Sequence, residues 1–252
     1  MDVNLPLLQR LEQSLKNAAV KSREKISHDY FDAFISSSPE PHLSFAVPKS
    51  GLENLAAIAS LKETFRERSR VARLEYFHEL YPDLKECLLE SGCKLDMSAP
   101  VMTLVPEDLS QSLEVSATYR VLTDDEEMLE KFLRRQSVAF GGAGGDDSLA
   151  WLPAMTDLLR SGELVGAVLA QNGEYVSGAV IQGAEDCELA GVWTLPHKQR
   201  QGLSTMLCGR LLAHYFSRGQ TLCWLSAAEG ALRLYEKLGF KCVGTQLNVQ
   251  LA

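Results

Sequence analysis

The apolar residues recur along the chain with two periods, and these periods predict helices and strands in alternation. Apolar side chains at helical spacing from Leu5 to Leu15 predict a first helix that runs to about Lys25. Further elements follow up to about residue 112. They are a Ser- and Pro-rich loop at 36–42, a strand at 43–48, a helix at 51–72, a strand at 73–77, a helix at 81–92 and a strand at 99–106.

A second region begins near residue 113 and is richer in strands. Asn172 and Gly173 stand between two apolar runs and predict a hairpin turn. The expected elements are a strand at 114–122, helices at 124–140 and 148–162, hairpin strands within 162–183, a strand at 187–196, a helix at 202–219, a strand at 221–227, a helix at 230–240 and a strand at 241–251. This order favours the α+β class, with an α/β mixed sheet. We therefore expect an N-terminal α/β domain at 1–112 and a second domain at 113–252.

Composition narrows the classes of function. The 252 residues carry a formal net charge of -8, and 46% are hydrophobic. The acidic balance argues against a general nucleic-acid surface, and no apolar run is long enough to cross a bilayer. The five histidines are scattered and form no metal-ligand grouping with cysteines, so we expect no metal. The six cysteines contain no CxxC pair, which indicates reduced thiols and a cytoplasmic protein.

One polar turn has the features of an anion site. The segment "HKQRQGLSTML" at 197–207 follows a strand that Pro196 ends, and it leads into a helix. The first amides of a helix have no partner inside the helix, and the helix dipole adds positive potential. Gly202 lacks a Cβ and lets the backbone approach a ligand closely. A diphosphate is the anion that best matches several successive amides.

The charge around this turn supports the same interpretation. No Asp or Glu occurs from Leu189 to Ala228, whereas an even spread of the 33 acids would place about five in forty residues. The window contains four cations, Lys198, Arg200, Arg210 and Arg218. Buried strands and helices without acids explain part of this pattern, but they explain the polar turn less well. We therefore expect a local positive region.

Two segments together resemble the GNAT superfamily of acyl-CoA-dependent N-acyltransferases. The superfamily's signature, [Q/R]-x-x-G-x-[G/A], is similar to the segment from Gln199 to Ser204, with Ser in the last place. The lead-in from Val192 to Pro196 and the helix "ALRLYEKLGF" at 231–240 also resemble the family. The resemblance covers about residues 114–252 and implies a GNAT fold for that part, beside a smaller N-terminal α/β domain.

The resemblance also implies how a coenzyme is held. Acetyl-CoA is the expected acyl donor, with its pyrophosphate on the amides of Gln199, Arg200, Gln201, Gly202, Leu203 and Ser204. The strands at 187–195 and 221–227 are expected to splay and admit the pantetheine arm. The backbone of Val192, Trp193 and Thr194 is expected to pair with that arm, and an amide there to polarise the acyl carbonyl.

The implied reaction is direct attack by a primary amine on the thioester in a ternary complex. Tyr235 matches the family's tyrosine that faces the coenzyme sulfur, and is the expected acid. Glu188 is the expected base, and a relayed water is the alternative; Asp186 and Glu229 are weaker candidates. Family members often carry Asn near the start of the last helix, where this chain has "AAEGA" at 227–231. Cys223 is expected to be buried and His214 to be packed among apolar side chains. Neither residue is expected to be catalytic.

Three further interpretations remain open from the sequence. The first is a catalytically silent acyl-CoA sensor or assembly module, and the second is a domain that binds another phosphate compound. The third concerns an internal repeat, because the segments at 84–94 and 232–241 align when Gly92 is set on Gly239. A true repeat would make the N-terminal domain a degenerate GNAT-like half.

The glycine-rich loop at 141–147 is a candidate lid. The acceptor stays unidentified, and a monomer or a homodimer is expected.

Overall fold

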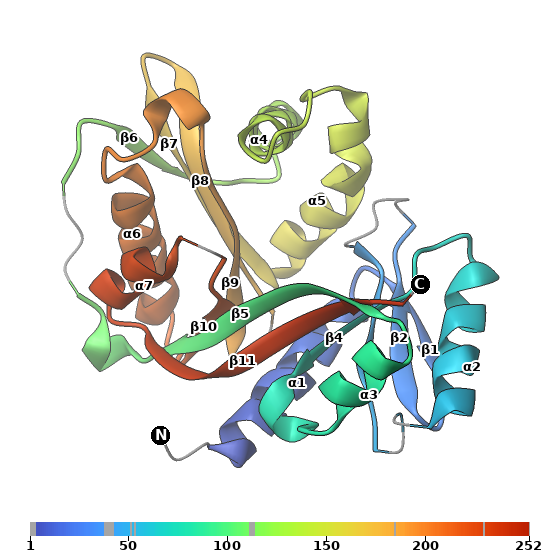
Figure 1. Ribbon diagram of the computed structural model, residues 1–252. Coiled ribbons are helices and arrows are strands. Elements are labelled where there is room, and N and C mark those ends of the chain that lie inside the picture. The colour runs from blue at the N-terminus through green and yellow to red at the C-terminus, as the bar shows by residue number, and fades with distance from the viewer. Residues whose placement is uncertain are drawn as a thin grey trace. The chain divides into compact units, whose positions relative to one another are not determined.

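The computed structural model describes residues 4–37, 43–50, 52, 54–110, 114–183, 185–228 and 230–251 (Figure 1). The contacts divide the chain into two compact units. Unit 1 comprises Met1–Met102, Ser226–Glu229 and Cys242–Ala252, and unit 2 comprises Thr103–Leu225 and Gly230–Lys241. Both units combine helices with parallel and antiparallel strands, so the predicted α+β class with a mixed sheet is confirmed.

Unit 2 contains the elements predicted from residue 114 to residue 240, in the predicted order, whereas the predicted last strand belongs almost entirely to unit 1. The elements of unit 2 are β6 (Thr118–Val121), α4 (Glu126–Ala139), α5 (Leu152–Ser161), β7 (Leu164–Gln171), β8 (Glu174–Gln182), β9 (Cys187–Thr194), α6 (Leu203–Ser217), β10 (Cys223–Ser226) and α7 (Leu232–Leu238). The strands lie in the order β6-β7-β8-β9-β10. The pairs are antiparallel except for β9 and β10, which are parallel.

Local chemistry accounts for the main boundaries in unit 2. Asp125 caps α4, because its Oδ1 accepts a hydrogen bond of 2.8 Å from the amide of Met128. Asn172 and Gly173 have φ of 49° and 80°, the left-handed pair that a two-residue hairpin turn between β7 and β8 requires. Pro153 stands in the first turn of α5, where its missing N–H costs nothing, so this helix begins at Leu152 and not at residue 148 as predicted.

The core of unit 2 lies between the sheet and its helices. Figure 1 shows α4 and α5 on one face of the strands and α6 on the other. Buried side chains of α4 and α5 pack on the first of these faces; they include Leu129, Phe132, Leu133 and Met155. The middle strands β7 and β8 are almost continuously buried, as strands covered on both faces should be.

Unit 1 contains strands in the order β1-β2-β3-β4-β11-β5. Its elements are α1 (Leu5–Ala19), β1 (Glu24–Ser27), β2 (Phe31–Ile35), β3 (Phe45–Pro48), α2 (Leu55–Arg66), β4 (Arg73–Phe77), α3 (Leu84–Glu90), β5 (Lys94–Leu104) and β11 (Lys241–Gln250). The last strand of the chain pairs antiparallel with β4, with Val249 opposite Leu74. Both residues belong to one buried apolar cluster.

The first forty residues differ from the sequence prediction. The predicted helix to about Lys25 was too long, because α1 ends at Ala19 and the short strands β1 and β2 follow. All five residues of β2 are buried, so no alternation marks them as a strand. The strand predicted at 99–106 begins earlier, at Lys94. Residues 38–42 of the loop predicted at 36–42 lie outside the described residues.

The two segments aligned as a repeat end in the same local geometry. Gly92 and Gly239 have φ of 80° and 102°. The next amide bonds back to the carbonyl five residues earlier in both cases: Cys93 to Leu88, and Phe240 to Tyr235, each at 3.0 Å. A strand precedes and follows each helix. Many unrelated helices end in this way, so the repeat and the degenerate GNAT-like origin of residues 1–112 both stay proposals.

The boundary at 112/113 also stays a proposal. The compact units divide at Met102, and unit 1 includes residues from Cys242 onward. Residues from Cys242 onward join unit 1 because β11 pairs with β4, far away in the sequence. Among the described residues, no helix has the length and apolar character needed to cross a bilayer.

Candidate functional site

The turn before α6 carries a run of unpartnered amides. Gly202 is the N-cap residue, and no side chain caps this helix. Within the described part of the chain, no group accepts a hydrogen bond from the amides of residues 200 to 205; the first bond of the helix joins the Met206 amide to the Gly202 carbonyl at 3.0 Å. The amides of residues 202–205 are the first donors of a 15-residue helix, and those of residues 200 and 201 directly precede them; unpaired donors at the positive end of a helix favour an anion.

The backbone of this turn is held in an uncommon conformation. Arg200 and Gly202 have φ of 64° and 78°. A Cβ on Gly202 would lie 3.4 Å from Cγ1 of Val115, so the constraint comes from backbone conformation more than from space. These left-handed residues turn the chain out of β9 and into α6.

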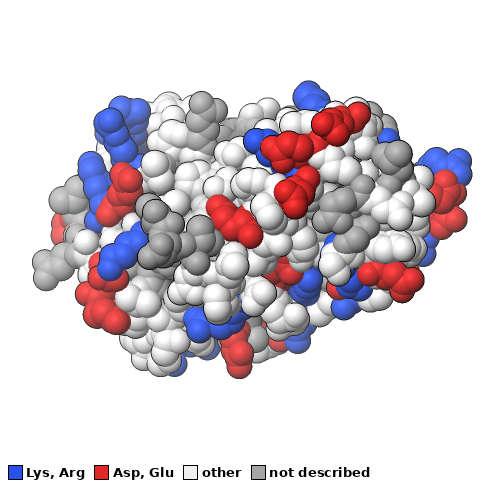
Figure 2. Space-filling view, turned by 60° about the horizontal axis from the view of Figure 1, so that its bottom comes forward, with Lys and Arg blue, Asp and Glu red and all other residues white. Residues whose placement is uncertain are grey.

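The positive region is smaller than the sequence predicted. Lys198 and Arg200 lie on the turn itself. Arg210 donates to Glu114 at 2.7 Å, so an acid from outside the acid-free window balances it. Arg218 follows the far end of α6, roughly 24 Å along the helix from Gly202. Figure 2 shows acidic and basic side chains interspersed over the face in view, without a dominant sign.

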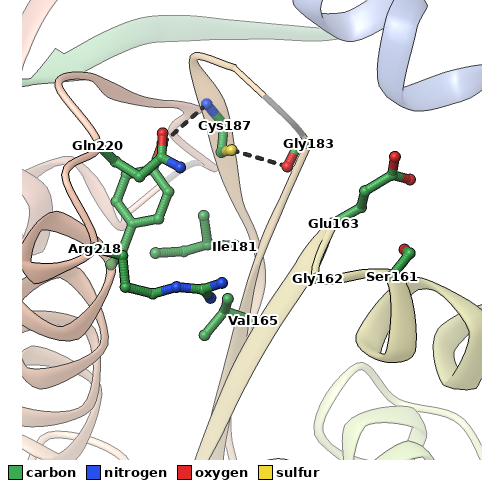
Figure 3. A pocket seen from close by; sticks show the side chains of 10 residues that line it. Ser161, Gly162, Glu163, Val165, Ile181, Gly183, Cys187, Arg218 and Gln220 are labelled. Atoms are coloured by element: carbon green, nitrogen blue, oxygen red, sulfur yellow. Dashed lines mark hydrogen bonds between the residues drawn. The ribbon is translucent and has the colours of Figure 1, made fainter.

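Arg218 lies instead beside a separate cavity of about 220 Å³. In Figure 3 its guanidinium points into this cavity next to Val165 and Ile181. Cys187, the first residue of β9, lines the same cavity and donates through its Sγ to the Gly183 carbonyl at 3.1 Å. The cavity is therefore at the opposite end of β9 from the Gly202 turn.

Strands β9 and β10 are paired only at their starts. Their register joins Cys187 to Cys223 and Glu188 to Trp224, and no further pair is found among the described residues. From Leu189 to Thr194, no described residue of β9 has a registered partner on β10. Two parallel strands that separate in this way leave the backbone groups of one β9 edge available to a ligand.

A bulge lies in the separated part of β9. Between Ala190 and Trp193 this strand has one residue more than β8, which pairs with them through Val180 and Gly178. Gly191 provides the bulge with a φ of 56°. The Trp193 indole is buried over Gly178, where a Cβ would come within 2.5 Å of the ring.

Three hydroxyls connect this strand to the Gly202 turn. Ser177 is fully buried and donates through its Oγ to the Trp193 carbonyl at 2.7 Å. Thr194 Oγ1 lies 2.8 Å from Ser177 Oγ and 2.6 Å from Ser204 Oγ. The serine that departs from the family signature thus has a structural use, because its hydroxyl ties α6 to β9.

Tyr235 is 7% exposed and belongs to unit 2, as do β9 and α6. Its ring meets Phe240 edge to face, with centroids 5.8 Å apart. Burial raises the pKa of its phenol, and Cys208 of α6 raises this pKa further. The phenol is therefore protonated at neutral pH, the form that a general acid needs.

Glu188 is half-buried in the paired part of β9. Its Oε2 accepts a hydrogen bond of 3.2 Å from Nε2 of Gln182 on β8. Val192 is four residues further along the strand, or roughly 13 Å. Asp186 precedes β9 with a φ of 46°, and Glu229 lies outside the described residues. Because Glu188 is this far from Val192, a proton relay through water stays the alternative to direct removal of the proton by Glu188.

The remaining sequence predictions have mixed outcomes. Cys223 is buried as predicted, and burial raises the pKa of its thiol well above the usual value. His214 is exposed, so the prediction of a packed side chain was wrong. The helical period places residue 214 on the solvent face of α6, between buried Leu211 and Tyr215. All six cysteines are free, and Cys242 is exposed.

The loop at 141–147 is tied to α4. Arg134 donates to the Gly144 carbonyl at 3.1 Å and to Asp146 at 2.7 Å, and the Gly144 amide donates to Ser137 Oγ at 3.3 Å. The proposed lid function remains a prediction, and any opening must break these bonds. Among the described residues, no group of three or more His, Cys, Asp or Glu side chains is placed to hold a metal ion.

Sequence reasoning missed two residues of this site. Ser177 and Gln136 both bond to β9, from β8 and α4. Neither lies near a recognisable motif, and their partners are 16 and 55 residues away. No local pattern of the sequence could have identified them.

Comparisons with known proteins identify the family and agree with the fold. A family model described as "Acetyltransferase (GNAT) family" matches residues 112–240. A GCN5-related N-acetyltransferase from Kribbella flavida is similar in structure, with a TM-score of 0.79 at 21% identity over 97% of this chain and 95% of that chain. A GCN5-related N-acetyltransferase from Sphaerobacter thermophilus has a TM-score of 0.65 at 15% identity, over 88% and 76% of the two chains.

A tandem GNAT protein from the clavulanic acid biosynthesis pathway is also similar in fold. Its TM-score is 0.60 at 11% identity, over 88% of this chain and 79% of that chain. No significantly similar sequence was found among curated proteins.

Proposed function

The chain belongs to the GNAT acetyltransferase family, and from this premise we propose that it transfers an acetyl group from acetyl-CoA to a primary amine. The amine attacks the thioester directly, in a ternary complex of the two substrates. The observation that carries this proposal is the run of unpartnered amides at residues 200–205, which adjoins the separated part of β9. A diphosphate and an extended pantetheine arm need these two features side by side.

The residues of the turn and of β9 fit such a donor. Gln199, Arg200, Gln201, Gly202, Leu203 and Ser204 form the proposed pyrophosphate contact. The backbone of Val192, Trp193 and Thr194 pairs with the amides of the pantetheine arm. The thioester supplies an activated acyl carbon when the donor is bound, and the protein supplies orientation and proton transfer.

Tyr235 and Glu188 have the two proton-transfer roles in this proposal. Tyr235 donates its phenolic proton to the departing thiolate, and the resemblance of its helix to the family's tyrosine helix supports this role. Glu188 removes a proton from the attacking amine, directly or through water. A Val192–Thr194 amide donates to the acyl oxygen as negative charge develops there. The six free cysteines support a reducing compartment such as the cytoplasm.

A catalytically silent acyl-CoA-binding module is the second candidate. The segment "AAEGA" at 227–231, where related proteins often carry Asn, supports it, and so does the bond that holds Glu188 to Gln182. A panel of primary amines tested with acetyl-CoA, with free thiol as the readout, separates the two. Amine-dependent thiol release supports the enzyme, whereas binding of acetyl-CoA without release under any amine supports the silent module.

Glu188→Gln tests the proposed base. This change keeps the shape and the contact to Gln182 but removes the proton acceptor, so we expect kcat to fall about tenfold to a hundredfold. The matched control is Glu174→Gln in the preceding strand, where the carboxylate contacts Arg135. An unchanged kcat for Glu188→Gln would assign the proton transfer to a relayed water.

A further inference from the structure

Gln136 on α4 contacts the backbone of the bulge in β9. Its Nε2 donates a hydrogen bond of 3.2 Å to the Gly191 carbonyl, across 55 positions of sequence. We propose that Gln136 is a positioning residue for acetyl transfer: it fixes the bulge so that the Val192 amide points at the acyl oxygen. This inference rests on the proposed function, and it assigns a role to a residue outside the family motifs.

The bulge gives this bond its importance. A regular strand aims its amides alternately to its two neighbours, and one extra residue re-aims those that follow. The extra residue lies between Ala190 and Trp193, so the bulge contains Gly191 and Val192. The orientation of the peptide between these two residues sets the direction of the Val192 N–H.

The bond from Gln136 holds the carbonyl of that peptide from outside the sheet. Gly191 has a φ of 56°, a conformation open to glycine at little cost. A Cβ at this position would lie 2.7 Å from Nε2 of Gln136, so the two residues are in close contact. The hydrogen bond from Gln136 therefore constrains the most permissive residue of β9.

A second contact from α4 holds the other side of Val192. Phe132 lies one helical turn before Gln136, and its ring meets Trp193 edge to face with centroids 5.7 Å apart. Gly178 of β8 has no Cβ, and this leaves the space that the indole fills. Helix α4 therefore contacts Gly191 through Gln136 and Trp193 through Phe132. The half-buried Val192 lies between these two contacts.

This arrangement predicts which kinetic constant changes. The Gly202 turn is tied to β9 separately, through Thr194 and Ser204, so the pyrophosphate contact does not depend on Gln136. A misdirected Val192 amide weakens stabilisation of the developing negative charge, which exists only in the transition state. Loss of the Gln136 bond should therefore lower kcat and leave the KM for acetyl-CoA nearly unchanged.

Gln136→Glu and Gln136→Met test the inference. Glu has the same shape but presents an acceptor to the Gly191 carbonyl, and Met removes the donor without adding charge. We expect kcat to fall about tenfold to a hundredfold in both variants, with the KM for acetyl-CoA within about twofold of the wild type. Amide hydrogen exchange should become faster in residues 190–193.

The matched control is Lys131→Met, on the same helix. Lys131 also donates to a backbone carbonyl of the sheet, that of Gly173 at 2.9 Å, but at the β7–β8 turn. The control should retain the wild-type kcat. The inference is overturned if the Gln136 variants keep kcat, or if exchange at 190–193 does not change. An inactive wild type would overturn the proposed function instead, and hydrogen exchange would still decide whether Gln136 holds the bulge.

Discussion

Tyr235→Phe should lower kcat by about 10²- to 10⁴-fold while acetyl-CoA still binds. The substitution removes only a hydroxyl, and the ring keeps its edge-to-face contact with Phe240. A thiolate that departs without a proton is a poorer leaving group, so the step that breaks the thioester slows. The measurement is the kcat for amine-dependent thiol release, with donor affinity determined by calorimetry.

Tyr119→Phe is the control for this result. Tyr119 also belongs to unit 2, its hydroxyl is buried, and it has no hydrogen-bond partner among the described residues. Burial raises the pKa of this phenol to about 12, and Arg210 acts in the opposite direction. The control should therefore keep the wild-type kcat. Equal activities of Tyr235→Phe and the wild type would remove Tyr235 from the mechanism.

Gly202→Asp should abolish the stabilisation that acetyl-CoA gives to the wild type. At a ligand concentration of about 100 times Kd, that stabilisation is roughly 2.7 kcal/mol, and a thermal-shift titration detects it. The new carboxylate lies among the amides of residues 200–205 and repels the pyrophosphate that they are proposed to bind. Electrostatic repulsion and competition for the same amide donors both weaken the binding of the pyrophosphate.

The control for this change is Gly219→Asp, beyond the other end of α6. Gly219 has a φ of 86°, close to the 78° of Gly202, so both variants carry similar backbone strain and the same change of charge. A Cβ at Gly219 meets no heavy atom within 4 Å. The control should keep the full shift with acetyl-CoA. A shift retained by Gly202→Asp would place the coenzyme elsewhere.

The order of helices and strands in unit 2 was predictable from the sequence. The hairpin at Asn172 and Gly173 and the turn at Gly202 depend on local chemistry, which a sequence displays directly. The pairing of β11 with β4 was not predictable, because hydrophobic period reveals a strand but not its partner. The boundary between the units follows from that pairing.

The candidate site was predictable only where it coincides with a motif. Gly202 and Tyr235 lie in recognisable segments, and both belong to unit 2. Gln136, Ser177 and the pairing of Arg210 with Glu114 depend on contacts between distant positions. The charge window overestimated the positive region for the same reason, since acids from outside the window reach into it.

The most direct test is amide NMR of the labelled wild-type protein titrated with acetyl-CoA. We expect the largest shift changes in two segments, residues 192–194 of β9 and residues 200–205 of the turn. Saturation should occur at one equivalent of ligand. Absence of shift changes, or changes confined to other parts of the chain, would contradict the claim that this turn and this strand hold the acyl donor.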